Sequence, residues 1–163
     1  MTGGMPRLAL FQPDIPQNTG TMLRLAACLG VPVAIVEPAG FDVSDRNFRR
    51  SGLDYLERAA VRRHPSWDAF EAWRRAEGAR LVLATTRGNT PYADHRFRPD
   101  DVILLGRESA GVPEEVHRAA DARVVVPMRA GLRSLNVAVA AAMILGEALR
   151  QTASFPALEG EPA

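Results

Sequence analysis

The sequence of 163 residues contains no lysine, so all 20 of its basic residues are arginines. Arginine carries a planar cation that pairs well with phosphate and carboxylate groups. The formal net charge is nevertheless only +1, which gives no overall basicity of the kind that attracts polyanions. Total charge therefore does not identify a ligand, and any cationic site has to come from the local placement of arginines.

Cysteine and histidine are also scarce. The one cysteine, Cys28, excludes an internal disulfide, and its place on an apolar helix face predicts a small core residue. The histidines His64, His95 and His117 are too scattered to form a metal site with it. The longest uncharged apolar run, residues 134–146, is too short to cross a bilayer, and no signal-peptide pattern is present. We therefore expect a cytoplasmic protein without a metal or a membrane span.

Three common catalytic patterns are missing. The sequence has no G-x-x-x-x-G-K-[ST], no G-x-G-x-x-G after its first strand and no G-x-S-x-G. Their absence argues against a Walker-type NTPase, a dinucleotide oxidoreductase and an α/β-hydrolase. What remains is a set of strand-end loops rich in glycine, serine, threonine, arginine and glutamate, which suits a polar organic ligand held mainly by the backbone.

Apolar runs with strand character alternate with segments of helical periodicity. This alternation predicts a single α/β domain over residues 1–163, with a mainly parallel sheet flanked by helices and flexible tails at 1–6 and 152–163. Asn18, Ser66 and Ser134 are predicted to cap helices, and Gly30 to end the first one. The predicted strands are 7–11, 31–37, 80–86, 101–106 and 124–127.

Residues 44–63 are unusually dense in arginine. One interpretation is a solvated helix face. The other is a surface that follows a phosphate backbone, with Phe48 and Tyr55 available for stacking. Taken by itself, the segment 44–63 favours neither interpretation. The arginines are Arg46, Arg49, Arg50, Arg58, Arg62 and Arg63.

The stretch 124–139 joins a β-branched strand end, a loop with Gly131 and the start of the last helix. Open α/β sheets usually bind ligands in crevices at the carboxyl ends of their strands, although an ordinary connection with a capping serine has the same pattern. The last helix is apolar on nearly all sides, which predicts a core contact together with a subunit interface. Its main stripe is Leu135, Val139, Ala142, Gly146 and Leu149.

Three segments, 15–24, 105–113 and 126–137, resemble the three motifs of the SPOUT class of RNA methyltransferases. Within that class the sequence is most similar to the small tRNA 2′-O-methyltransferases that act on cytidine or uridine at wobble position 34. Residues 49–55 and 85–88 also match that family, and the resemblance covers roughly residues 8–150 in consistent order. Arg107 and the pair Ala138–Val139 depart from the usual family pattern.

The resemblance implies a SPOUT-type fold with a deep trefoil knot in its C-terminal part and a homodimer. It also implies transfer of a methyl group from S-adenosyl-L-methionine to the ribose 2′-hydroxyl of nucleotide 34 in tRNA. Alternatives are 2′-O-methylation of another tRNA site or of rRNA, and a catalytically silent RNA-binding dimer. The implied cofactor-binding residues are Ala84, Thr85, Gly106, Gly111, Val126, Met128, Ser134 and Leu135.

The resemblance also assigns catalytic roles. It implies that the motif-one arginine, here Arg24, removes the proton of the 2′-hydroxyl. Because a guanidinium holds its own proton far above neutral pH, we expect Arg24 instead to orient the hydroxyl and an adjacent phosphate and to stabilise the developing alkoxide charge. Asn18, Glu108 and Asn136 would hold that site in shape. The residues expected to contact the tRNA backbone are Arg46, Arg49, Arg50 and Tyr55.

Overall fold

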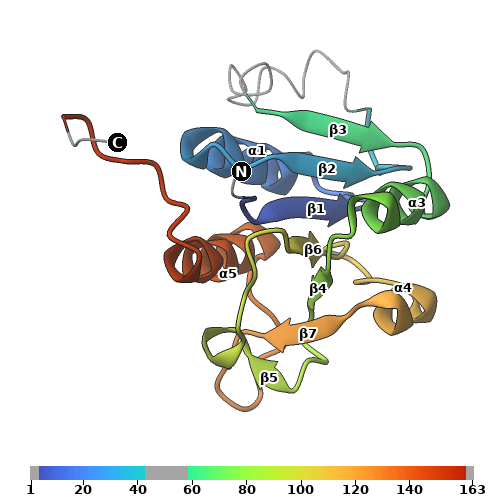
Figure 1. The fold of residues 1–163 in the computed structure, drawn as a ribbon. Helices are drawn as coiled ribbons and strands as arrows, with labels where there is room; N and C mark the ends of the chain where they lie inside the picture. Colours follow the sequence, from blue (N-terminus) through green and yellow to red (C-terminus); the bar gives the residue numbers. More distant parts are fainter. Residues whose placement is uncertain (1–3, 43–58, 161–163) are drawn as a thin grey trace.

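The computed structural model describes residues 4–42 and 59–160 (Figure 1). Within these residues seven strands form one sheet in the order β3-β2-β1-β6-β4-β7-β5, and every neighbouring pair is parallel. This arrangement confirms the predicted α/β class with its parallel sheet. The strands are β1 (Arg7–Phe11), β2 (Val33–Val36), β3 (Val61–His64), β4 (Leu81–Ala84), β5 (Thr90–Pro91), β6 (Val102–Leu105) and β7 (Ala122–Val125).

Helices cover both faces of the sheet, as Figure 1 shows. Successive strand residues point to opposite faces, so β1 sends Leu8 and Leu10 into one core and Ala9 and Phe11 into the other. Helices α1 and α5 close the first core, and α3 and α4 close the second. The helices are α1 (Pro16–Leu29), α3 (Trp67–Glu77), α4 (Glu114–Ala119) and α5 (Val137–Gln151), with a 3₁₀ turn η1 (Tyr92–Asp94).

Two helix ends follow the sequence prediction. Ser66 caps α3, because its Oγ accepts a hydrogen bond from the backbone N–H of Ala69. Gly30 ends α1 in the left-handed conformation with φ of 68°. Both signals are local, since a capping hydroxyl and a residue without Cβ act on the backbone beside them.

Two predicted caps are wrong. Helix α1 begins at Pro16, so Asn18 lies in its first turn rather than at its cap. Proline suits this position because it has no N–H to leave unpaired. Helix α5 begins at Val137 and is capped by Asn136, so Ser134 remains in the preceding loop. Both asparagines thereby become available for a contact between the two helices.

Three further expectations are corrected. Cys28 is exposed rather than part of the core. Residues 61–64 at the end of the arginine-dense segment form strand β3, which excludes a helix face for that part. Thr90 and Pro91 lie outside every predicted strand, yet they pair with β7 as the short edge strand β5.

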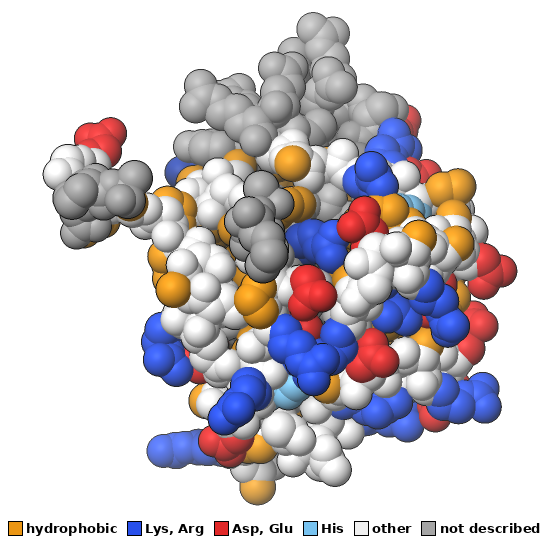
Figure 2. All heavy atoms as spheres, in the orientation of Figure 1, with side chains coloured by type: hydrophobic (Ala, Val, Ile, Leu, Met, Phe, Trp, Pro, Cys, Tyr) orange, Lys and Arg blue, Asp and Glu red, His pale blue; other side chains and the backbone are white. Residues whose placement is uncertain are grey.

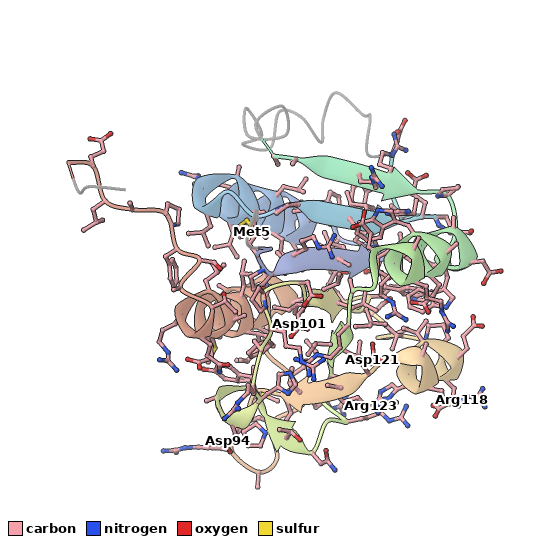
Figure 3. All side chains as sticks on the ribbon, in the orientation of Figure 1. Met5, Asp94, Asp101, Arg118, Asp121 and Arg123 are labelled. Carbon is pink, nitrogen blue, oxygen red and sulfur yellow. The ribbon has the colours of Figure 1, made fainter. Side chains whose placement is uncertain are left out.

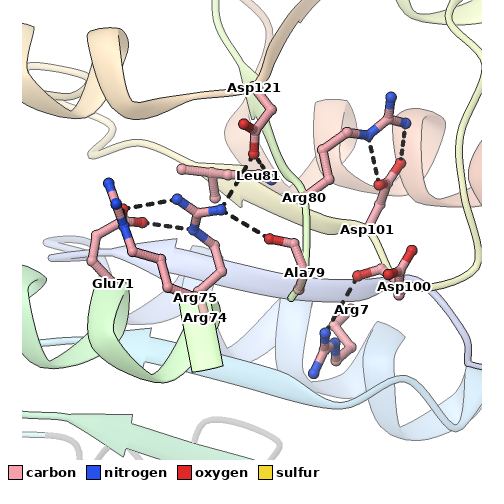
Figure 4. Close-up of polar contacts among 10 residues, drawn as sticks. All are labelled: Arg7, Glu71, Arg74, Arg75, Ala79, Arg80, Leu81, Asp100, Asp101 and Asp121. Carbon is pink, nitrogen blue, oxygen red and sulfur yellow. Dashed lines mark hydrogen bonds and ion pairs between the residues drawn. The ribbon is translucent and has the colours of Figure 1, made fainter. Parts of the chain in front are cut away.

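Ion pairs with buried members lie within α3 and at the starts of β4 and β6 (Figure 4). Arg74 is nearly buried and binds both carboxylate oxygens of Glu71 at 2.7 and 2.8 Å, a pairing that raises the pKa of Arg74. Arg80 binds the fully buried Asp101 in the same two-pronged way, at 2.8 and 2.7 Å. Figure 3 labels Asp101 and Asp121, which flank β4. These carboxylates fix where β4 and β6 begin.

The termini differ in their packing. Met5 packs against the core beside α1, where Figure 3 labels it. After α5, Ser154 donates its backbone N–H to the carbonyl of Leu149, and residues 155–160 are exposed. In the parts of the chain that the structure describes, every helix falls short of the length and apolarity that crossing a bilayer requires.

Candidate active site

A pocket of about 570 Å³ lies where β4, β6 and β7 end. Parallel strands end at the same edge of a sheet, so the loops that follow them meet there. Three such loops, at 84–86, 105–112 and 124–137, form most of the wall. The pocket brings together all the residues predicted to bind the cofactor, which are Ala84, Thr85, Gly106, Gly111, Val126, Met128, Ser134 and Leu135.

The loop after β6 folds back on itself at Gly106. Arg107 and Gly111 exchange two backbone hydrogen bonds of 3.0 and 2.9 Å. A Cβ added to Gly106 would lie 2.9 Å from the carbonyl carbon of Gly111, closer than real side chains approach. Gly111 itself has φ of 64°, which favours glycine. The loop therefore needs glycine at both positions and presents bare main chain to the pocket.

The loop after β4 is held by Thr85. Its backbone N–H donates to the carbonyl of Val124 at 2.9 Å, and its Oγ1 lies 3.3 Å from Nε2 of His117. Burial, followed by the charge of Arg87, lowers the pKa of His117, so the ring is neutral near pH 7. A neutral imidazole thus supports one wall of the pocket from α4.

Asp14 and Glu108 form a second support. The backbone N–H of each residue donates to the carboxylate of the other, at 3.3 Å in both cases, and the Ser109 hydroxyl also bonds to Asp14. Burial and then the neighbouring Asp14 raise the pKa of Glu108, whereas the hydrogen bond from Glu108 lowers the pKa of Asp14. Oε1 of Glu108 is buried and has no hydrogen-bond partner among the described residues. The pocket therefore contains a carboxyl group with unused hydrogen-bonding capacity.

Sequence reasoning missed the role of Asp14. It stands between Pro13 and Ile15, where the pattern indicates only the end of a strand. A carboxylate directly before a motif helix was the available signal, but nothing local shows that its partner lies 94 positions further along the chain. Asp14 therefore emerges from the tertiary structure alone.

Asn18 and Asn136, two of the four predicted catalytic residues, are joined directly. Nδ2 of Asn136 donates to Oδ1 of Asn18 at 3.0 Å, and both residues line the pocket together with Glu108. The fourth predicted residue, Arg24, is exposed on α1 and is not among the residues that line this pocket. One chain thus assembles three of the four predicted groups around the pocket and places the arginine elsewhere on the helix that carries Asn18.

The residues predicted to contact RNA, Arg46, Arg49, Arg50 and Tyr55, lie outside the described residues. Of the arginine-dense segment, the structure describes Arg62 and Arg63 on β3. Within the described residues no group of three or more acidic, histidine or cysteine side chains is placed to hold a metal ion.

Comparison with known proteins identifies the class. Residues 5–146 match the family model described as the SpoU rRNA Methylase family, and the chain belongs to this family of methylases. The SpoU methyltransferase AviRb from Streptomyces viridochromogenes, solved in complex with AdoMet, is 32% identical with a TM-score of 0.82, over 93% of this chain and 62% of that chain.

The particular family follows from relatives of similar length. A tRNA (cytidine(34)-2′-O)-methyltransferase of Beijerinckia indica is 64% identical over 155 residues, which cover 95% of this chain and 97% of the relative. A solved structure described as giving insights into 2-OH methylation of C/U34 on tRNA is 40% identical with a TM-score of 0.86, over 93% and 98% of the two chains. The chain belongs to the tRNA (cytidine(34)-2′-O)-methyltransferase family.

Proposed function

We propose that this protein transfers a methyl group from S-adenosyl-L-methionine to the ribose 2′-hydroxyl of cytidine or uridine 34 in tRNA. The observation that carries this proposal is the convergence of three strand-end loops on one pocket that contains every predicted cofactor residue. Relatives that span nearly the whole chain carry the same activity in their names. Because the proposed substrate is tRNA, we propose that the enzyme acts in the cytoplasm.

The pocket fits the proposed cofactor. Its volume of about 570 Å³ lies in the range of small-molecule sites, and its wall combines main chain at Gly106 with apolar groups such as Leu105 and Val124. The close approach of Gly106 to Gly111 leaves backbone groups where side chains would otherwise stand. When bound, S-adenosyl-L-methionine supplies a methyl group already activated by the sulfonium charge. The residues that would hold it are those of the loops at 84–86, 106–111 and 126–135.

The protein then has to place the hydroxyl and stabilise its oxygen. We assign the positioning of the surrounding loops to Asn18, Asn136 and Glu108, which line the pocket. We assign to Arg24 a hydrogen bond to the 2′-oxygen, which would stabilise the negative charge that develops there as the hydroxyl gives its proton to solvent and its oxygen takes the methyl group from the sulfonium sulfur. A fixed cation suits this role because guanidinium does not lose its proton near pH 7.

We further propose that the enzyme is a homodimer in which Arg24 serves the pocket of the partner subunit. Arg24 is exposed on α1, which packs against α5. Helix α5 and the loop before it expose Leu132, Leu135, Val139 and Met143, with 38–68% of each residue accessible. Such a group of exposed apolar side chains, on α5 and the loop before it, is typical of a covered surface. This interface would bring α1 of one chain toward the partner.

The C-terminal trefoil knot belongs to the same proposal. The segment 126–136 joins β7 to α5 and shares the pocket with the loop at 105–112 that follows β6. Threading of this last segment through the loop after β6 would explain why both loops contribute to one small cavity.

Incubation with methyl-labelled S-adenosyl-L-methionine and an unmodified tRNA transcript tests the function. We expect one labelled methyl group per tRNA, located at nucleotide 34 by mass mapping of nuclease fragments. A transcript with 2′-deoxyribose at position 34 is the matched control and should accept none. Label on rRNA alone, or at another tRNA nucleotide, would contradict the proposal.

The variant Arg24→Ala tests the catalytic assignment. The exposed position predicts an unchanged thermal unfolding temperature and a loss of turnover, because the stabilising charge is gone. Arg150→Ala, at another exposed helix arginine, is the control. Full turnover by Arg24→Ala would remove Arg24 from the mechanism.

A further inference from the structure

A second cavity, of about 400 Å³, lies at the opposite edge of the sheet, where β1, β2 and β3 begin. Its lining includes Ala34, on the face of β2 that α3 covers, and Pro32 directly before that strand. Arg7 precedes Ala9 on the same face of β1, and Arg62 pairs with Ala34 in the register of β2 and β3. Two arginines therefore flank this small apolar lining.

Trp73 of α3 completes the cavity. The guanidinium carbons of Arg7 and Arg62 lie 5.1 and 5.5 Å from the centroid of its ring. Both distances fall within the range of cation–π contacts. The indole Nε1 is buried and has no hydrogen-bond partner among the described residues. The cavity thus combines two cations with one face of an aromatic ring.

The charge balance of this cavity favours an anion. Its lining holds the two guanidinium groups of Arg7 and Arg62 against one carboxylate, that of Glu77. Among the described residues neither arginine pairs with a carboxylate, although Arg7 donates to the backbone carbonyl of Asp100 at 3.3 Å (Figure 4). Arg63, next along β3, pairs with Glu37 instead. Elsewhere on the side that carries α3, basic and acidic side chains are interspersed (Figure 2).

We propose that this cavity binds one nucleotide of the tRNA other than the methylated one, with its phosphate on Arg7 and Arg62. The apolar lining at Pro32 and Ala34 receives a ring face of the same nucleotide. The inference deepens the proposed function and rests on it, since it assigns a second contact of the same substrate.

A polynucleotide is favoured over a free anion because the two cavities lie at opposite edges of one sheet. A long polyanion can reach both edges at once. Arg62 also belongs to the described part of the arginine-dense segment 44–63. The cavity therefore includes one arginine from the segment whose composition favours contacts along a phosphate backbone.

The variant Arg62→Gln in the full-length protein tests the site. Arg62 is exposed on an edge strand, so the fold should be retained. We expect the KM for tRNA to rise about tenfold, with kcat at saturating tRNA unchanged, which is the effect of losing one charged hydrogen bond in binding. The slope of log affinity against log salt should also become shallower by about one.

Arg63→Gln is the matched control, because it removes the same charge from the neighbouring position on the opposite face of β3. It should leave the KM for tRNA and the salt slope nearly unchanged. If both variants lower the slope equally, only net charge matters and the assigned site is wrong. Absence of methyl transfer by the unsubstituted protein would instead disprove the proposed function itself.

Fluorescence distinguishes the source of the phosphate. The chain has two tryptophans, so Trp67→Phe leaves Trp73 as the reporter. We expect tRNA to change the emission of Trp73, and Arg62→Gln in the same background to weaken that change. Inorganic phosphate and cytidine 5′-monophosphate are the comparison probes. If phosphate or cytidine 5′-monophosphate changes the emission of Trp73 and tRNA does not compete with it, the assignment to tRNA is wrong. It is also wrong if no probe changes the emission.

Discussion

Asn136 donates its side-chain amide to Oδ1 of Asn18 over 3.0 Å and thereby joins two helix starts that are 118 positions apart. Its own Oδ1 accepts from the backbone N–H groups of Ala138 and Val139, at 2.9 and 3.3 Å, and so caps α5. The side chain of Asn136 therefore caps α5 at the end of the loop that lines the pocket, and it also joins that loop to α1. These two duties can be separated by substitution.

Asn136→Ser retains a capping oxygen but has no amide to reach Asn18. We expect its free energy of unfolding to stay within about 0.5 kcal/mol of the unsubstituted protein, while methyl transfer falls severalfold. Asn136→Ala loses the cap as well and should cost about 1 kcal/mol in urea unfolding. Asn18→Ala should lose activity as Asn136→Ser does. Equal activity in all four proteins would show that the contact has no role in the site.

Gly106→Ala tests whether the loop after β6 needs bare backbone. The new methyl group would stand 2.9 Å from the carbonyl carbon of Gly111, so the loop has to open. Because the clash is with backbone, no side chain can rotate away from it. We expect calorimetry to show S-adenosyl-L-methionine affinity falling by tenfold or more, about 1.4 kcal/mol. Unchanged affinity in a folded variant would show that the loop can adjust.

Local signals were enough to predict part of the fold. The alternation of apolar runs predicted the parallel sheet, and Ser66 and Gly30 predicted helix ends, because a cap or a left-handed turn depends on one residue and its neighbours. At the last helix, Ser134 and Asn136 are both good capping residues. The choice between them follows from the contact with Asn18, which no local pattern contains.

Strand β3 escaped prediction for a related reason. Val61–His64 has two central arginines and no apolar alternation, so its backbone pattern is set by pairing with β2 and not by its own side chains. The pocket residues were predicted from motif resemblance, whereas periodicity indicated only that loops would meet at the strand ends. Asp14 shows the limit of both approaches, since its partner Glu108 is distant in sequence.

The neutral state of His117 makes stability depend on pH. Its native pKa lies below the ordinary 6.5, so its contribution is complete above that pH and is lost as the pH falls through the native pKa. His117→Gln removes this dependence. We expect urea midpoints of the two proteins to converge, or cross, between about pH 7 and about pH 5. A constant difference would show that His117 does not titrate as assigned.

Breaking the buried pair of Asp101 and Arg80 should be costly. Asp101→Asn removes the fully buried carboxylate that binds Arg80, whose side chain is 19% exposed, which predicts a loss of about 3 kcal/mol in urea unfolding. Asp100→Asn is the matched control, because its neighbouring side chain is exposed, and it should cost less than about 0.5 kcal/mol. Equal losses would assign the effect to total charge and not to the buried pair.

The exposed apolar side chains on α5 and the loop before it give the sharpest test of the proposed dimer. Val139 is 49% accessible, so a glutamate there has water around it in a single chain and should not disturb the fold. In a dimer the same carboxylate would be buried without a partner, and dissociation would relieve that cost. We therefore expect Val139→Glu to halve the mass seen in light scattering while α-helical circular dichroism is retained. Methyl transfer should fall with it, since Arg24 would no longer reach the pocket of the partner.

Ala72→Glu is the control for this last variant, because Ala72 is exposed on α3, which covers the other face of the sheet. It should leave both mass and activity unchanged. A Val139→Glu protein that stays dimeric would place the interface on another surface. A monomer that keeps full activity would place Arg24 at the pocket of its own chain. The proposal that Arg24 serves the pocket of the partner would then be wrong, whether or not the protein forms a dimer.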